Sequence, residues 1–336
     1  MADTYTRIAT GDALAVLRQL PAESIHCCVT SPPYWMLRDY GVDGQIGLET
    51  TPQEYIGRLM QVFDEVWRTL RHDGTCWVVI GDTYFGSNKG VGYTGPAKER
   101  FRFQQLPHVR DGKAKCLGLI PQRFAIAMTD RGWILRNALI WHKPNAIPSS
   151  VKDRFTVDYE DVFFFTKSGR YYFEQQFIPY KVATANRIQQ FLKNNESFDP
   201  MRHKNLGGQA RMAILERLAH KNLHIPLQPP HGMHRRRVDG RGEAALRVEG
   251  ANMRTVWTIP VGRCLDAHFA VYPEKLIEIP IKAGCPQGGI VLDPFCGAGT
   301  TAIVSERLGR SFCGIELNPD YVDIAKRRIR QARDGG

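Results

Sequence analysis

The sequence has no apolar run of 18 residues, so it predicts no membrane-spanning helix. Its first residues, Met1 to Tyr5, lack the features of a signal peptide. None of the eight cysteines forms a C-x-x-C pair, the common unit of zinc sites and redox motifs. Several cysteines lie in apolar stretches, which is typical of small buried side chains in a reducing cytosol. We therefore expect a cytoplasmic protein without a membrane segment, disulfides or a bound metal.

Acidic residues are few relative to basic ones: 34 Asp and Glu stand against 45 Lys and Arg, for a formal net charge of +11. This excess suggests a polyanionic partner but does not identify it. The 336 residues, 43% of them hydrophobic, suffice for two domains or for one large domain with an insertion.

The stretch Ser31-Pro32-Pro33-Tyr34 is the first candidate for chemistry. It follows a short apolar run that predicts a buried strand. Neither proline has an N–H to continue a sheet, so the chain must leave the sheet at the carboxyl end of that strand, where α/β sheets bind ligands. A flat ring could stack on Tyr34 or Trp35 while Ser31 and the proline carbonyls accept its amino hydrogens. These residues alone are equally compatible with a plain turn beside core aromatics.

The second candidate is a predicted strand, glycine turn and helix near the C-terminus. It contains the run Asp293-Pro294-Phe295-Cys296-Gly297-Ala298-Gly299-Thr300. Glycines let a ligand approach the backbone, and the start of a helix offers free N–H groups. Glu316 ends the next predicted strand, about twenty residues after the loop, where nucleotide folds bind ribose hydroxyls. The loop also fits the dinucleotide pattern, so alone it does not separate a nicotinamide site from another adenosine site.

Together the two stretches resemble the motifs of amino-methyltransferases that modify DNA with S-adenosylmethionine. The segment from Thr30 to Trp35 is similar to their catalytic (S/D/N)-P-P-(Y/F/W) motif, and Asp293 to Thr300 to their cofactor motif D-P-F-x-G-x-G-T. The catalytic motif comes first, as in the circularly permuted β group. The resemblance implies an α/β fold: a circularly permuted class I methyltransferase (Rossmann-like) sheet, with helices on both faces and an inserted target-recognition region.

The resemblance also implies roles for individual residues. The expected catalytic residues are Ser31, Pro32, Pro33 and Tyr34. The expected contacts of the cofactor, S-adenosylmethionine, are Asp12, Asp293, Phe295, Gly297, Gly299, Thr300 and Glu316. Asp12 has a simpler explanation as the cap of a helix that starts at the next residue. A further family stretch, W-x-K-x-x-x-x-P, is matched by Trp141, Lys143 and Pro148.

The domain prediction divides the chain into three parts. Residues 1–180 form the catalytic half of the methyltransferase domain, and residues 251–336 the cofactor-binding half. Between them, residues 181–250 contain thirteen Lys or Arg against six Asp or Glu, and we expect this basic insertion to recognise the DNA target. The glycine-bearing stretch 83–115 is expected to be a long loop that either closes over the DNA or is a flexible insertion.

Ser31 favours cytosine N4 as the methylated atom, because Asp or Asn at this position is more typical of adenine-N6 enzymes of the resembled family. The adenine-N6 methyltransferase is therefore the alternative, and an NAD-dependent oxidoreductase is a distant one. The expected partners are double-stranded DNA and a cognate restriction enzyme, with the protein a monomer or homodimer.

We also expect the segment 171–173 to pair with the strand at 159–167 as a hairpin.

Overall fold

A computed structural model describes residues 7–86, 112–178, 251–262 and 272–334. The chain divides into two compact units, one of residues 1–174 with 254–336 and the other of residues 175–253. In the second unit the described residues form a short antiparallel pair, β6 (Phe177–Ile178) with β7 (Ala251–Asn252). The predicted basic insertion and most of the 83–115 loop lie outside the described residues, so both remain predictions.

The first unit contains a mixed eight-stranded sheet in the order β1-β10-β9-β2-β3-β5-β4-β8. Its strands are β1 (Arg7–Thr10), β2 (Ile25–Thr30), β3 (Leu70–Ile80), β4 (Ile134–His142), β5 (Tyr159–Thr166), β8 (Val256–Thr258), β9 (Ile290–Asp293) and β10 (Ser311–Glu316). Only β5 runs antiparallel to its neighbours, β3 and β4. The predicted α/β class is confirmed.

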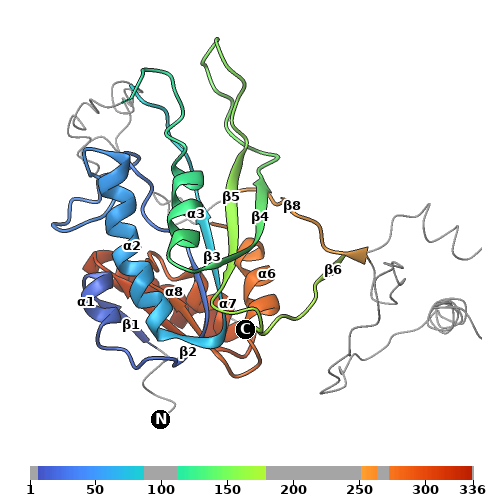
Figure 1. Ribbon diagram of the computed structural model, residues 1–336. Coiled ribbons are helices and arrows are strands. Elements are labelled where there is room, and N and C mark those ends of the chain that lie inside the picture. The colour runs from blue at the N-terminus through green and yellow to red at the C-terminus, as the bar shows by residue number, and fades with distance from the viewer. Residues whose placement is uncertain (1–6, 87–111, 179–250, 263–271, 335–336) are drawn as a thin grey trace, which may run out of the picture. The chain divides into compact units, whose positions relative to one another are not determined.

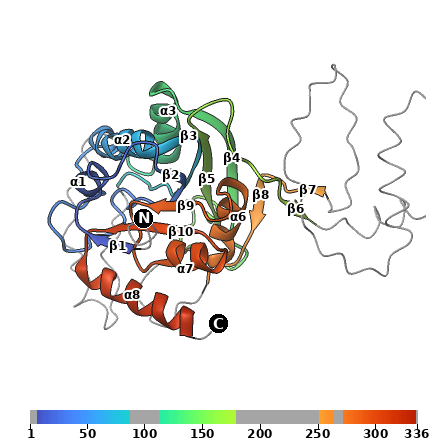
Figure 2. The same cartoon turned by 90° about the horizontal axis from the view of Figure 1, so that it is seen from below.

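Helices cover both faces of the sheet (Figures 1 and 2). One face carries α1 (Ala13–Leu17), α2 (Pro52–Thr69) and α3 (Ile120–Asp130), and the other carries α6 (Glu274–Gly284), α7 (Thr300–Arg307) and α8 (Pro319–Asp334). The apolar stripe of α2 is buried at Tyr55, Leu59 and Phe63, as its helical spacing predicts. A capping box of Thr51 and Glu54 starts this helix. No helix among the described residues is long and apolar enough to cross a membrane.

The predicted hairpin of residues 171–173 with β5 is wrong. Both edges of β5 are taken by β3 and β4, which leaves no edge for another strand. The aromatic residues of the segment pack instead on the buried ring of Phe164. The Phe173 ring stacks on it at 5.6 Å between centroids, and the Tyr171 ring meets it edge-on at 5.8 Å. The alternating aromatics thus reflect side-chain packing rather than strand pairing.

Candidate active site

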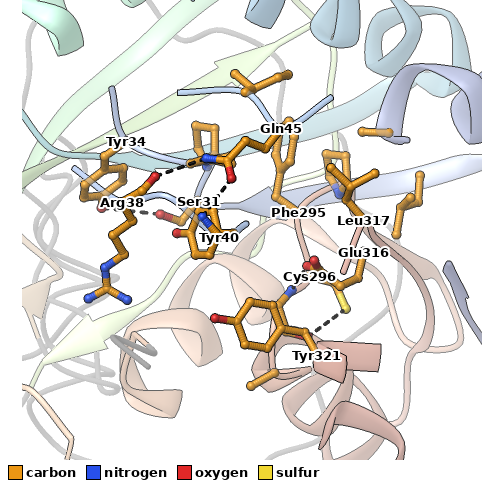
Figure 3. A pocket seen from close by; sticks show the side chains of 18 of the residues that line it. Ser31, Tyr34, Arg38, Tyr40, Gln45, Phe295, Cys296, Glu316, Leu317 and Tyr321 are labelled. Carbon is orange, nitrogen blue, oxygen red and sulfur yellow. Dashed lines mark hydrogen bonds between the residues drawn. The ribbon is translucent and has the colours of Figure 1, made fainter. Parts of the chain in front are cut away.

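A pocket of about 280 Å³ lies where strands of the first unit end (Figure 3). The turns that follow β1, β2, β9 and β10 all reach it, because parallel strands point their carboxyl ends to the same edge of the sheet. It brings together residues that are more than 300 positions apart in the chain, such as Gly11 and Tyr321. The predicted site residues that line it are Asp12, Ser31, Pro32, Pro33, Tyr34, Phe295, Gly297, Thr300 and Glu316.

Only one of the two proline carbonyls in the turn after β2 is available to a ligand. The Pro33 carbonyl accepts a hydrogen bond of 2.8 Å from the Tyr55 hydroxyl of α2. The Pro32 carbonyl accepts none from the described residues, so it stays available to a ligand. Trp35 is only 1% exposed and its ring N–H is bonded to the Glu49 carbonyl, so the proposed stacking of a ligand on this ring is wrong.

Tyr34 and Ser31 are linked to two charged residues that the sequence analysis did not assign to the site. The Tyr34 hydroxyl lies 2.6 Å from Oε2 of Glu160, and the Ser31 hydroxyl lies 3.3 Å from the Tyr34 hydroxyl. The other Glu160 oxygen forms an ion pair with Lys143, which lies 4.5 Å from the centre of the Trp141 ring. Burial, and next the negative charge of Glu160, raise the pKa of Tyr34 well above its usual value.

These two residues come from adjacent strands. Glu160 lies in β5 opposite Trp141 of β4, and Lys143 follows the end of β4. Lys143 belongs to the W-x-K match, which placed it in a family stretch without a role. Glu160 was missed because a carboxylate at the start of an apolar strand is typical of an ordinary exposed strand end. Its side chain is only 17% exposed, and its place at the site follows only from the antiparallel pairing.

The Tyr34 ring packs directly on the backbone at Gly81, the residue after β3. A Cβ atom at this position would lie 2.7 Å from Cε2 of the ring, well inside contact distance. Glycine here therefore leaves room for the ring beside the end of the neighbouring strand. A ligand can contact Tyr34 only where the residue lines the pocket.

The loop after β9 has the shape that a nucleotide-like ligand requires. Gly297 has a φ of 51°, and an added Cβ there would meet no protein atom within 4 Å. Because Gly297 lines the pocket, such a Cβ would occupy ligand space. Gly299 does not line the pocket; its φ is 80° and an added Cβ would lie 2.9 Å from Ala325 of α8. Gly299 thus serves helix packing, and its predicted cofactor contact stays a prediction.

Glu316 ends β10 with its carboxylate at the pocket wall. Its Oε2 accepts from the Gly297 N–H at 2.9 Å and its Oε1 from the Asn318 N–H at 2.8 Å. A carboxylate has about four acceptor positions, so each oxygen can still accept a ligand hydroxyl. Burial raises the pKa of Glu316, and the two backbone donors oppose that shift. The paired acceptors, with the open approach at Gly297, fit the ribose of an adenosine cofactor.

Asp293 lies behind the loop rather than in the pocket lining. It is 2% exposed and accepts hydrogen bonds from Thr30 at 2.6 Å, Thr301 at 2.6 Å and Tyr272 at 2.9 Å, as well as from the Phe295 N–H. Burial raises its pKa, although each of these donors acts in the opposite direction. Asp293 therefore ties the end of β2 to the loop after β9, and a direct cofactor contact stays a prediction.

Asp12 reaches the pocket from β1 but also caps α1, since its Oδ1 accepts from the Ala15 N–H at 2.9 Å. The simpler explanation given by the sequence is confirmed, while the contact with a cofactor remains a prediction.

Tyr40 and Tyr321 form an edge-on pair at 6.0 Å in the same wall of the pocket, and the sequence analysis did not predict them there. Tyr40 comes from an irregular stretch whose periodicity gave no signal. Among the described residues no cluster of three potential metal ligands is present.

The chain is similar to known proteins over most of its length. The family model for N6/N4 DNA methylases matches residues 25–327. The type II methyltransferase M.Cfr9I of Citrobacter freundii is 38% identical over 95% of this chain and 86% of its own length. M.SmaI of Serratia marcescens is 34% identical over 97% of this chain and 91% of its own.

The chain belongs to the N6/N4 DNA methylase family. Membership confirms the predicted DNA methyltransferase and S-adenosylmethionine as its methyl donor. The alternative hypothesis of an NAD-dependent oxidoreductase therefore no longer has support.

Solved structures share the fold. The cytosine-N4-specific PvuII DNA methyltransferase has a TM-score of 0.59 and 19% identity, covering 98% of this chain and 91% of its own. The Thermus thermophilus protein TTHA0409, complexed with S-adenosyl-L-methionine, has a TM-score of 0.55 and 22% identity, covering 98% of this chain and 97% of its own.

Proposed function

We propose that the protein transfers a methyl group from S-adenosylmethionine to the N4 amino group of a cytosine flipped out of double-stranded DNA at a specific site. The observation that carries the proposal is the shared pocket: the Ser31-Pro32 turn and the loop at Gly297 with Glu316 line one cavity. The amino group of a paired cytosine is bonded within the duplex, so the base must leave the stack before it can enter.

In this proposal one side of the pocket binds the cofactor and the other binds the target base. When bound, S-adenosylmethionine supplies a methyl group on a positively charged sulfur, a strong electrophile. Glu316 and the Gly297 backbone would hold the cofactor by its ribose, and Phe295 and Thr300 line the same wall. Ser31 and the Pro32 carbonyl accept the two amino hydrogens of the base, which aims the nitrogen lone pair away from the ring and toward the methyl group. The Tyr34 ring, which lines the pocket, stacks on the base.

The choice of cytosine rests on Ser31. A neutral hydroxyl at this position is typical of cytosine-N4 enzymes in the family the sequence resembles, whereas a carboxylate or amide is more typical of adenine-N6 enzymes. Adenine also presents an amino group beside a ring nitrogen, so adenine N6 is the second candidate. The volume between Tyr34 and the opposite wall decides whether a purine enters.

The order of the motifs supports the β-group permutation as part of the proposal. The strand that leads to the catalytic turn, β2, precedes β9 in the chain by more than 250 residues yet pairs with it in the sheet. The predicted insertion at 181–250 would then recognise the target sequence. The type II relatives support a cognate restriction enzyme as partner.

The test is to incubate unmethylated plasmid DNA with the protein and S-adenosylmethionine, digest it to nucleosides and identify the modified base by mass spectrometry. N4-methylcytosine is the expected product. N6-methyladenine as the sole product would replace the base assignment with the second candidate. Absence of any methylated base, with a protein that binds S-adenosylmethionine in calorimetry, would contradict DNA as the substrate.

A further inference from the structure

A chain of hydrogen bonds leads from an ion pair to the hydroxyl that faces the pocket. Lys143 pairs with one oxygen of Glu160, the other oxygen lies 2.6 Å from the Tyr34 hydroxyl, and that hydroxyl lies 3.3 Å from Ser31 Oγ. All four residues line the pocket. The Glu160 and Lys143 side chains are 17% and 19% exposed, so water screens the pair only in part.

The chemistry of the ion pair fixes the direction of every link. An ionised carboxylate only accepts hydrogen bonds, so the Tyr34 hydroxyl must donate its proton to Glu160. The raised pKa of Tyr34 keeps that proton in place at neutral pH. The Tyr34 oxygen then accepts, and the donor is the Ser31 hydroxyl. With its only proton directed at Tyr34, Ser31 faces the pocket with lone pairs alone.

In this arrangement Ser31 has no proton left to donate to a ring nitrogen of the base. A Ser31 oxygen without an available proton suits an amino group, which donates, and repels a carbonyl oxygen, which accepts. Cytosine carries an amino group at carbon 4, where thymine and uracil carry a carbonyl. The same oxygen is also the one that must draw the amino hydrogen for methyl transfer.

We propose that Glu160 is a positioning residue, held by Lys143, that orients the Tyr34 and Ser31 hydroxyls so that the target pocket accepts an amino group and rejects a carbonyl. The proposal rests on the methyltransferase function proposed above and goes beyond it by assigning the selection to Glu160, a residue outside the catalytic turn. It holds for cytosine and adenine alike, since both present an amino group.

The first test is the variant Glu160→Gln. Its amide can donate an N–H to the Tyr34 hydroxyl, which allows every hydrogen bond in the series to reverse its direction. The matched control is Asp161→Asn, the same chemical change at the next residue of β5, which does not line the pocket. We expect the single-turnover methylation rate to fall about tenfold in Glu160→Gln, the loss of roughly one oriented hydrogen bond, and to stay within about twofold in the control. Affinity for S-adenosylmethionine should be unchanged in both.

The second test measures binding alone and needs no methyl transfer. Once methylated plasmid has revealed the recognition sequence, two duplexes are prepared with cytosine or thymine at the target position, each mispaired with thymine. The wild type should prefer the cytosine duplex, and Glu160→Gln should lose about fivefold or more of that preference. Lys143→Met keeps the carboxylate, so the preference should survive in it.

A double-mutant cycle distinguishes an effect transmitted through these hydrogen bonds from a merely structural effect of Glu160. Tyr34→Phe breaks the same chain at the next link, so Glu160→Gln should add less than about twofold in the Tyr34→Phe background. Additive losses, or an unchanged preference in Glu160→Gln, would overturn the inference. These outcomes differ from failure of the proposed function, in which the wild type itself methylates no base.

Discussion

The two ends of the pocket are built from different chemical groups. At the Gly297 end, backbone N–H groups, a glycine in the left-handed region and one carboxylate form the wall, and the buried Asp293 holds the loop from behind. At the Ser31 end, side-chain hydroxyls and an ion pair across two strands form the wall. A backbone cradle suits a cofactor that is the same for every member of a family. Side chains suit the end where substrates differ.

The contrast also predicts how each end fails. Removing a group behind the Gly297 end should damage the fold, because that group joins strands, whereas removing a group at the Ser31 end should damage the reaction alone. The first three of the four variants that follow probe this difference.

Asp293→Ala should have the largest effect, and it should be on stability. The substitution leaves the hydroxyls of Thr30, Thr301 and Tyr272 without their shared acceptor in the core. Unpaired buried donors and a cavity are expected to lower the free energy of unfolding by roughly 3–5 kcal/mol. Urea unfolding followed by circular dichroism measures this. Asp293→Asn, which keeps the shape and one acceptor, should lose clearly less; equal stability of Asp293→Ala and wild type would remove the linking role.

Glu316→Ala should come next and act on cofactor affinity. Hydrogen bonds from ribose hydroxyls to a carboxylate are worth roughly 1.5–3 kcal/mol, so the dissociation constant for S-adenosylmethionine should rise by about 10- to 150-fold. Isothermal titration calorimetry provides the measurement. The control is Glu306→Ala, which removes a partly buried carboxylate of α7 that is paired with Arg333 and does not line the pocket. A titration curve like that of the wild type would refute the ribose contact.

Ser31→Ala should leave both stability and cofactor affinity nearly unchanged while slowing methyl transfer. One neutral hydrogen bond is worth about 0.5–1.5 kcal/mol, so the single-turnover rate should drop by roughly 2- to 15-fold. Ser24→Ala, a hydroxyl removed just before β2 and outside the pocket, is the matched control. If the main change were in the affinity for S-adenosylmethionine, the assignment of this end to the base would be wrong.

Sequence patterns predicted the Gly297 end better than the Ser31 end, and the reason is physical. The glycine loop and Glu316 belong to consecutive elements, β9, α7 and β10, so their spacing along the chain already encodes their proximity. The proline turn could be found because two prolines end a strand wherever they occur. Its partners could not: Glu160 reaches Tyr34 only because β5 runs antiparallel between β3 and β4.

Local signals also misled where tertiary packing decided the outcome. The aromatic run at 171–173 has strand-like composition, yet no sheet edge was free to pair with it. Trp35 looked like a stacking platform from its place after the prolines, but its ring fills the core beside Phe85. In both cases the residues were correctly interpreted as apolar. The error lay in which part of the protein they pack against.

Asp161→Asn should have the smallest effect, and it sharpens the contrast between neighbouring carboxylates of β5. Glu160 has Lys143 beside it, whereas burial, and next the negative charges of Asp82 and Glu160, raise the pKa of the half-buried Asp161 to about 6. A carboxyl whose pKa is higher in the folded state than its usual value near 3.8 favours folding while it is protonated. That contribution is complete below about pH 4 and is lost as the pH rises through about 6, so the ionised group destabilises the fold at neutral pH.

Replacing this carboxyl with a neutral amide should therefore raise the free energy of unfolding at about pH 7.5, by less than about 1 kcal/mol because water screens the exposed part of the group. The gain should shrink steadily below about pH 6 and vanish near pH 4, where the wild-type carboxyl is also neutral. Urea unfolding of both proteins across this range supplies the measurement. Asp158→Asn, an exposed carboxylate beside His142, is the control and should show no gain at neutral pH. A gain for Asp161→Asn that stays constant across the whole range would mean that better packing of the amide, and not removal of the charge, is responsible.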